Sequence, residues 1–205
     1  AFDTSAPTFR HKQFEAYKAQ REETPEELRP QFGRVKQLME SFGVPVFELE
    51  GWEADDVIGT LSAQAEKMGL DSVILTGDRD TFQLISPKVK VDLASSIQDR
   101  KVYDETELQN RYSGLTAAQQ TDFKALLGDT SDNIPGVPRV GEKRAIGLLT
   151  EFQNLEGIYQ HLEEVKPPSV KDSLAENRER AFENRILMTI DRNAPVELDL
   201  EASRF

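Results

Sequence analysis

The stretch from residue 46 to residue 76 constrains the fold more than any other part of the sequence. Two short apolar segments, residues 46–49 and 72–76, flank a segment over residues 53–68 whose apolar side chains recur at helical spacing and which Gly69 closes. A helix of this length between two short apolar strands is typical of the right-handed crossover that joins parallel strands. The sequence therefore predicts an α/β fold with a parallel sheet.

Further elements are expected on both sides of this crossover. A helix over residues 24–43 is predicted from Thr24 as its N-cap and Pro25 in its first turn. Residues 89–93 and 101–103 favour two more strands, with a turn at Ser95 and Ser96 between them.

From Asp104 onward the pattern is helical, and this part is expected to be a separate domain. Gly114 and the N-cap Thr116 interrupt the pattern, so we expect an α/β domain over residues 1–113 and a helical domain over residues 114–205. The expected helices cover residues 104–112, 116–127, 142–152, 155–164 and 170–189.

The composition narrows the chemistry to carboxylates. The chain has no cysteine and two histidines, which excludes disulfides and thiolate metal sites and leaves little for a zinc site or a Ser-His-Asp triad. No apolar run is long enough to span a membrane and the first residues lack a signal pattern, so we expect a cytoplasmic protein that binds no membrane. The net charge of −12 argues against a nucleic-acid partner. Residues 9–21 and 139–144 are nevertheless locally basic, and a net count averages these segments away.

The acidic residues occur in short motifs at expected element ends. Glu53, Asp55 and Asp56 open the helix over residues 53–68; Glu53 and Asp55 flank its apolar stripe, whereas Asp56 points more nearly away. Acids in a first helical turn are also ordinary partners of the helix dipole, so this motif alone leaves both interpretations open.

Two more acidic pairs follow along the chain. Asp78 and Asp80 come directly after an apolar strand, where parallel sheets form their sites, although a polar turn with an Asp cap is the simpler alternative. Asp129 and Asp132 form a third pair, which would share one face if that turn is helical. Converging carboxylates would need hard divalent cations, Mg²⁺ or Mn²⁺, and two such ions about 4 Å apart hydrolyse phosphodiesters in many enzymes.

Residues 128–145 combine glycines with basic side chains. Gly136 and Gly141 allow the backbone to approach a ligand closely, and Lys143 and Arg144 add positive charge where a helix begins near Glu142. A pair of glycines before a helix is often only a turn, but the whole stretch is far more specific.

At this point the sequence resembles a known family, the structure-specific 5′ nucleases or flap endonucleases, and most closely the 5′-3′ exonuclease domains of bacterial DNA polymerases I. Similar motifs stand in the family's order along the whole chain: Phe2-Asp3, Phe9-Arg10-His11, Tyr17-Lys18, Glu53-Ala54-Asp55-Asp56, Thr76-Gly77-Asp78-Arg79-Asp80 and Gly128-Asp129 to Ala145. The resemblance implies a PIN-like parallel-sheet nuclease core with a helical arch near residues 9–30. An all-helical domain with a helix-hairpin-helix, or helix-three-turn-helix, element near residues 128–150 would follow it.

The resemblance also assigns roles to particular residues. It implies two divalent ions, Mg²⁺ or Mn²⁺, bound by eight carboxylates: Asp3, Glu53, Asp55, Asp56, Asp78, Asp80, Asp129 and Asp132. Arg10, Lys18 and Arg21 would belong to the arch and contact the flap or the scissile phosphate, the alternative being a solvated basic face. The hairpin would grip the duplex backbone, with a K⁺ ion as in relatives, through Gly136, Val137, Gly141, Lys143 and Arg144.

The implied function is that of a divalent-metal-dependent 5′-3′ exonuclease and 5′-flap endonuclease of DNA replication and repair. Its substrate would be DNA with a 5′ flap, nick or duplex end, and it would be a monomer, with a polymerase domain linked to it in the full-length protein. Family members carry a further ligand-bearing strand before the position of Asp3, where this sequence starts. Two alternatives therefore stay open: a DNA-binding module without catalysis, and a ribonuclease of the related PIN type.

Overall fold

The computed structural model describes residues 1–21, 24–94, 96 and 98–204. Contacts divide the chain into two compact units: a first unit formed by Ala1–Leu70 with Asp191–Phe205, and a second unit formed by Asp71–Ile190. The boundary predicted at residues 113–114 lies inside the second unit and stays a prediction. Residues 22–23 of the predicted arch, and Ser95 of the predicted turn, lie outside the described residues.

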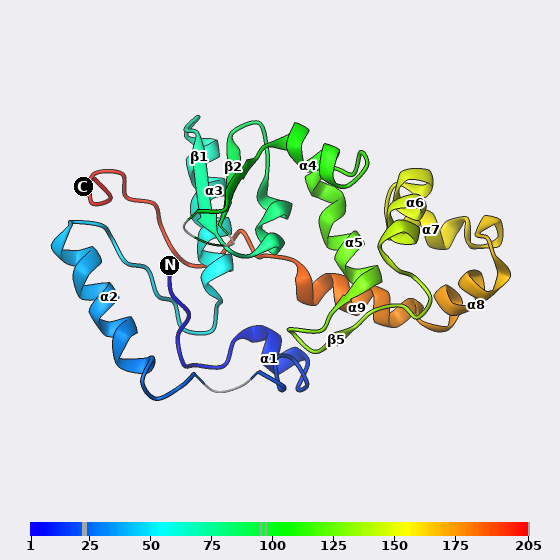
Figure 1. Ribbon diagram of the computed structural model, residues 1–205, viewed down its shortest axis with the longest axis horizontal. Helices are drawn as coiled ribbons and strands as arrows, with labels where there is room; N and C mark the ends of the chain where they lie inside the picture. The colour runs from blue at the N-terminus through cyan, green and yellow to red at the C-terminus, as the bar shows by residue number, and fades with distance from the viewer. Residues whose placement is uncertain (22–23, 95, 97, 205) are drawn as a thin grey trace. The chain divides into compact units, whose positions relative to one another are not determined.

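The described residues of the first unit form the helices α1 (Phe9–Gln13), α2 (Arg29–Ser41) and α3 (Ala54–Lys67) (Figure 1). Helix α3 is the helix predicted over residues 53–68. Glu53 is its N-cap, and Gly69 follows it in the left-handed conformation at φ +78°. The strand predicted over residues 46–49 is wrong: in the described chain Glu48 makes a single parallel bridge with Phe2. Pro45, which lacks an N–H, cannot extend a ladder there.

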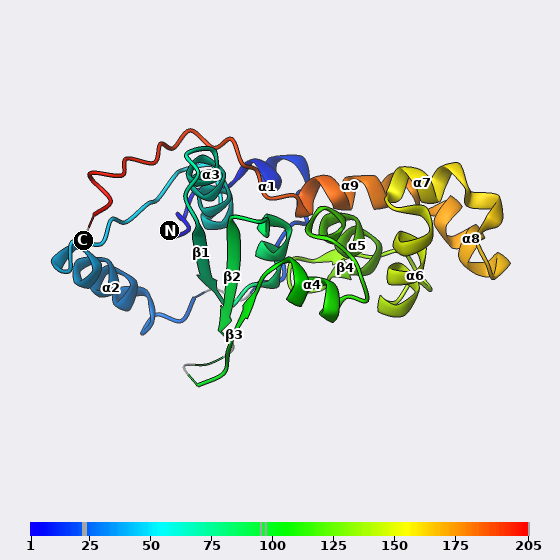
Figure 2. The same ribbon diagram turned by 90° about the horizontal axis from the view of Figure 1, so that it is seen from above.

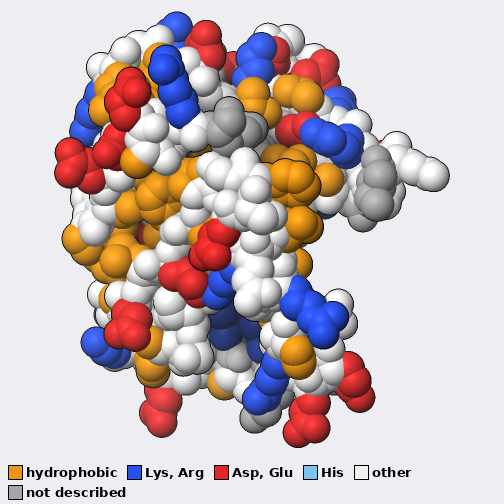
Figure 3. Space-filling view, turned by 90° about the vertical axis from the view of Figure 1, so that its left-hand side faces the viewer, with side chains coloured by type: hydrophobic (Ala, Val, Ile, Leu, Met, Phe, Trp, Pro, Cys, Tyr) orange, Lys and Arg blue, Asp and Glu red, His pale blue; other side chains and the backbone are white. Residues whose placement is uncertain are grey.

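Helix α2 begins at Arg29 and not after Thr24 as predicted. A separate turn, closed by the Leu28 N–H on the Pro25 carbonyl at 2.9 Å, comes first. Pro30 explains the late start, because proline fits the first turn of a helix and breaks its interior. No residue of α2 is buried, and Phe32 is 44% exposed. Hydrophobic side chains gather on the face of the molecule drawn in Figure 3.

The second unit begins with a three-stranded sheet in the order β1 (Ser72–Thr76), β2 (Val89–Ala94) and β3 (Arg100–Tyr103) (Figure 2). Strands β1 and β2 are parallel, and β2 and β3 are antiparallel, so the sheet is mixed. The 3-10 helix η1 (Arg79–Leu84) connects β1 to β2. It buries Phe82 and Leu84 in the core, which holds η1 at the carboxyl end of β1.

The rest of the second unit is helical, as the sequence predicts. Helix α6 has the predicted bounds, whereas two predicted helices are each broken in two, at His161 and at Asn177. Asn177 binds the Ser173 carbonyl with its own side chain at 2.8 Å, so it ends one helix and starts the next. The elements are α4 (Glu105–Arg111), η2 (Ala117–Gln119), α5 (Gln120–Leu127), β4 (Gly128–Asp129), β5 (Ile134–Pro135), α6 (Glu142–Phe152), α7 (Leu155–Gln160), η3 (Leu162–Glu164), α8 (Pro168–Glu176) and α9 (Arg178–Met188).

Helices α5 and α9 pack along each other and hold the short β4–β5 hairpin (Figure 1). The buried Asn184 side chain of α9 donates to the carbonyls of Ala125, at 3.0 Å, and Pro135, at 2.8 Å. Both carbonyls would otherwise be costly to bury. Among the described residues, no helix is long and apolar enough to cross a membrane.

Candidate functional site

The first unit gathers four of the predicted ligands, Asp3, Glu53, Asp55 and Asp56, which we call the first acid group. The Asp3 carboxylate accepts a hydrogen bond from the Ala54 N–H at 2.7 Å, so it lies at the amino end of α3. Free N–H groups and the helix dipole stabilise negative charge at that end. The local structure therefore brings Asp3 to the motif that contains the other three residues, although 51 residues separate it from Ala54.

Within this group, both carboxylate oxygens of Asp56 accept hydrogen bonds from other groups of the chain. Arg10 binds both of its oxygens, at 2.7 and 2.8 Å, and neither side chain is more than 3% exposed. The backbone N–H groups of Glu53 and Asp191 also donate to it, at 3.0 and 2.8 Å. The family resemblance implies that Asp56 is a metal ligand and that Arg10 contacts phosphate. This geometry favours a structural pair instead.

Glu53 faces a second cation of the first unit. Lys18 Nζ lies 2.6 Å from Glu53 Oε1, and the buried Tyr17 hydroxyl donates to Oε2 at 3.1 Å. Lys18 itself has φ +56°, an unusual backbone conformation for a residue other than glycine. Arg21 is exposed three residues further along the same segment. Lys18 and Arg21 are thus placed where a substrate can reach them more easily than it can reach Arg10.

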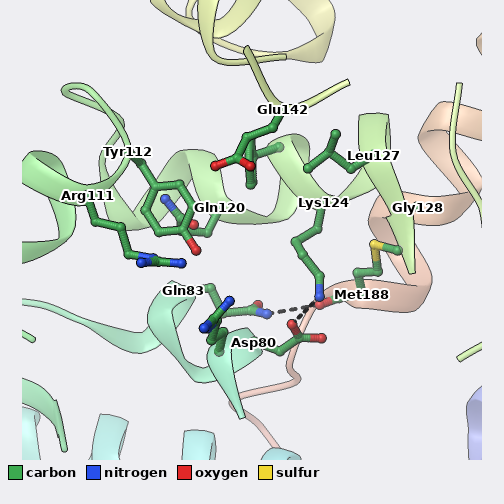
Figure 4. A pocket seen from close by; sticks show the side chains of 12 residues that line it. Asp80, Gln83, Arg111, Tyr112, Gln120, Lys124, Leu127, Gly128, Glu142 and Met188 are labelled. Carbon is green, nitrogen blue, oxygen red and sulfur yellow. Dashed lines mark hydrogen bonds and ion pairs between the residues drawn. The ribbon is translucent and has the colours of Figure 1, made fainter. Parts of the chain in front are cut away.

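The second unit gathers the other four predicted ligands, Asp78, Asp80, Asp129 and Asp132, which we call the second acid group. Asp78 follows β1 and caps η1 by accepting from the Asp80 N–H at 2.8 Å. Lys124, from α5, lies 2.5 Å from Asp80 Oδ1 (Figure 4). It also lies 2.7 Å from Asp129 Oδ2. Asp129 ends strand β4 and Asp132 lies in the turn that follows, so neither is in a helix, and the Asp132 N–H donates to Asp129 at 3.3 Å.

The electrostatics of the second acid group show a shortage of positive charge. Burial raises the pKa of Asp80, and the charges of Asp78 and Asp129 raise it further, although Lys124 opposes them. Burial alone would raise the pKa of Asp129 as well, but hydrogen bonds from Lys124 and Ser131 outweigh it and the pKa falls. Despite its own burial, Lys124 has a raised pKa because of Asp80 and Asp129. The ammonium of Lys124 therefore forms ion pairs with two carboxylates, those of Asp80 and Asp129.

The glycines of the hairpin have different roles. A Cβ on Gly136 would lie 2.0 Å from the Leu127 carbonyl oxygen, so glycine is required there for backbone packing. Val137 is buried, and its N–H donates to the Leu126 carbonyl at 2.8 Å. Both predicted DNA contacts thus face the interior of the unit. Gly141, the N-cap of α6, has open space around it and leaves the helix start accessible.

The basic residues of the hairpin are exposed. Arg144 donates to the Arg139 carbonyl, which fixes the turn before α6. The Lys143 side chain has no ion-pair partner among the described residues. Two side chains that support this turn, Asn184 and Ser173, are not predicted from the sequence; Ser173 donates to the Pro138 carbonyl at 2.6 Å. Nothing in their sequence context marks them, because their partners are at least 35 residues away.

A cavity of about 250 Å³ lies beside the second acid group (Figure 4). Asp80 and Lys124 line it together with Arg79, Arg111 and Glu142, the first residue of α6. Within the described part of the chain, no three acidic or histidine side chains form a ready metal site, because basic side chains lie between the carboxylates. All the donors are oxygen atoms, which suits Mg²⁺ or Mn²⁺.

Acids at the end of a sheet strand, followed along the chain by a helical part with a glycine-rich hairpin, agree with the class of protein that the sequence predicts, a nuclease. The chain belongs to the 5′-3′ exonuclease family: residues 1–113 match its N-terminal resolvase-like domain and residues 115–205 its C-terminal SAM fold.

Comparison with individual proteins agrees with this family. DNA polymerase I of Bacillus caldotenax is 45% identical over 202 residues, which cover 98% of this chain and 23% of the relative. DNA polymerase I of Chloroflexus aurantiacus is 46% identical over 207 residues, which cover 100% of this chain and 22% of the relative. The chain thus spans less than a quarter of these curated relatives. A crystal structure of the bacteriophage T5 flap endonuclease, in a pseudo-enzyme-product complex with DNA and metal ions, has a TM-score of 0.76 at 26% identity and covers 91% of this chain and 71% of its own.

Proposed function

We propose that this chain hydrolyses a phosphodiester near the 5′ end of a DNA strand, at a flap, nick or duplex end, with two bound divalent ions. The second acid group carries this proposal. Asp80, after the end of β1, and Asp129, in the hairpin, lie against one ammonium, and burial together with the charges of Asp78 and Asp129 raises the pKa of Asp80. A divalent cation would compensate that charge. The bacteriophage T5 relative was crystallised with DNA and metal ions.

The ligand set that we propose differs from the sequence prediction at one residue. Asp78, Asp80, Asp129 and Asp132 of the second acid group and Asp3, Glu53 and Asp55 of the first would hold Mg²⁺ or Mn²⁺. Asp56 is left out because Arg10 and two backbone N–H groups already occupy its oxygens. When bound, such ions supply an activated water and stabilise the leaving oxygen.

The basic residues would orient the DNA. Lys18 and Arg21 would contact the phosphate to be cleaved, since both lie in the predicted arch and neither is buried like Arg10. Gly141, Lys143 and Arg144 would bind the duplex backbone at the start of α6, with a K⁺ ion at the hairpin. Gly136 and Val137 would support this contact from inside. Such contacts position the DNA without reading its sequence.

The match to a small part of two DNA polymerases I supports a further proposal, that a polymerase domain is linked to this chain in the full-length protein. We propose that this protein acts as a monomer. The alternative of a DNA-binding module without catalysis gains no support from the acid groups, because carboxylates that face phosphates weaken binding unless a cation lies between them.

Cleavage of a labelled 5′-flap DNA tests the proposal. We expect cleavage with Mg²⁺ or Mn²⁺ and none with a chelator. Asp78→Asn should lower the cleavage rate by at least about 100-fold, because it removes a ligand of an ion that stabilises the transition state. It should leave DNA affinity unchanged or higher.

Asp71→Asn is the matched control, because Asp71 is 81% exposed in a surface pair with Lys88. It should cleave like the unmodified chain. Full activity of Asp78→Asn, or cleavage in the presence of the chelator, would contradict the assignment of the site.

A further inference from the structure

Lys124 is shared between two acidic side chains that come from different elements of the second unit. It projects from α5 to Asp80 in η1, at 2.5 Å (Figure 4), and it also lies 2.7 Å from Asp129 in β4. All three side chains are largely buried, with 27%, 19% and 16% of their surface exposed. At this burial the attraction between opposite charges is much less screened than at the surface.

The two carboxylates have little other compensation on the side that faces Lys124. Asp80 Oδ1 is buried and makes no hydrogen bond of regular geometry besides this ion pair. The Asp129 oxygen on the opposite side, Oδ1, accepts from the Ser131 N–H and hydroxyl and from the Asp132 N–H. Its Oδ2 faces Lys124. The ammonium thus sits at the position between two carboxylate oxygens that a bound cation would take.

Lys101, another lysine of the second unit, has an ordinary surface pair. It lies 2.5 Å from Glu107, but both side chains are at least 40% exposed and the pair contains one acid. Such surface pairs contribute little to stability. Lys124 differs from Lys101 in its burial and in the number of acids that it serves.

We infer that Lys124 is a tethered counter-ion of the metal site, which holds Asp80 and Asp129 together without a metal ion and must leave when one binds. The inference rests on the proposed function, since it concerns the same carboxylates. It has two consequences. Lys124 stabilises the second unit when metal is absent, and it weakens metal binding because the ion has to displace it.

Lys124→Met tests both consequences, since methionine keeps the apolar stem and removes the charge. In a chelator, we expect its thermal midpoint to fall below that of the unmodified chain, because the carboxylates then repel one another. Calorimetric titration should show Mg²⁺ bound about tenfold more tightly, a difference of about 1.4 kcal/mol. Saturating Mg²⁺ should therefore raise its thermal midpoint by more than that of the unmodified chain.

Three further variants complete the experiment. Lys101→Met should match the unmodified chain in both measurements, and Lys124→Arg, which keeps the charge, should stay close to it. Lys124→Met/Asp129→Asn removes one cation and one acid together, so its thermal midpoint in chelator should recover most of the loss. If the double variant melts as low as Lys124→Met, then Lys124 contributes packing only and the inference is wrong.

The outcomes separate this inference from the proposed function. Mg²⁺ binding to the unmodified chain, with equal or weaker binding to Lys124→Met, would overturn the inference alone. No Mg²⁺ binding to either chain would overturn the proposed function, and the inference with it.

Discussion

The two acid groups of this molecule contain the same kinds of side chain but satisfy them differently. In the first unit, Arg10 and Lys18 face Glu53 and Asp56, and Asp56 has four donors around its two oxygens. In the second unit, one ammonium faces Asp80 and Asp129, and the pKa of Asp80 stays raised.

The difference shows how to separate structural from functional acids. Carboxylates whose charge is balanced inside the chain hold the fold, because breaking a buried pair leaves an uncompensated charge. Carboxylates whose charge is not balanced have a reason to bind a cation from solution. The same argument applies to basic side chains. Arg10, in its buried pair, would hold the fold, whereas the exposed Lys143 is available to bind phosphate.

The largest effect on stability is expected from Arg10→Met. Removing the guanidinium leaves the carboxylate of Asp56, which is 0% exposed, without its ion-pair partner. The free energy of unfolding should therefore fall by about 3–5 kcal/mol. Urea denaturation measures this loss. Lys12→Met, an exposed position in the same helix α1, is the control and should change stability by no more than about 0.5 kcal/mol.

The two variants also decide between the two roles of Arg10. If Arg10→Met unfolds like Lys12→Met but loses flap cleavage, then Arg10 contacts phosphate in solution, as the family resemblance implies. The contrast between the balanced carboxylate of Asp56 and the unbalanced second acid group would then fail.

A smaller effect is expected from the exposed cations of the hairpin. Lys143→Ala/Arg144→Ala should weaken duplex binding equally for all sequences and reduce the slope of log affinity against log salt by about 2, because two phosphate contacts are lost. Fluorescence anisotropy across a salt series measures the slope. Lys88→Ala/Lys101→Ala removes two charges from the sheet side of the same unit, and its slope should stay unchanged. Equal slopes for both double variants would mean that Lys143 and Arg144 do not contact phosphate and only form a solvated helix surface.

Much of the fold could be predicted from local patterns. Helix α6, the helix α3 with its glycine end, and strands β1 to β3 depend on apolar spacing and on caps that lie next to them in the sequence. The errors arose from a proline inside a predicted helix, from a side chain that competes with the helix backbone, and from one distant contact. Pro30 delays the start of α2, and the Asn177 side chain splits a predicted helix. In the part of the chain that the structure describes, residues 46–49 form a single β-bridge, from Glu48 to Phe2, which sequence spacing does not reveal.

The acidic residues of the candidate site could be predicted from the sequence, whereas the positions of its basic side chains could not. Motifs of two acids at element ends can be recognised in the sequence, whereas Lys124 is a single lysine in an amphipathic helix, five residues before Asp129. Its importance depends on Asp80, which lies 44 residues earlier in the chain. Likewise, Arg10 carries the family's motif, yet its side chain is buried against Asp56, and no residue within one helical turn of it indicates that pair.

The central claim is that the second acid group binds the metal and that the Arg10–Asp56 pair does not. Mn²⁺ binding, followed by electron paramagnetic resonance of the free ion, tests it with two variants. Asp80→Asn should weaken the tightest site by at least about tenfold, because it removes a ligand. Arg10→Met/Asp56→Leu removes the buried pair as a unit, which costs less stability than removing one partner. It should bind Mn²⁺ like the unmodified chain. Normal binding by Asp80→Asn, together with lost binding by the pair variant, would contradict the account.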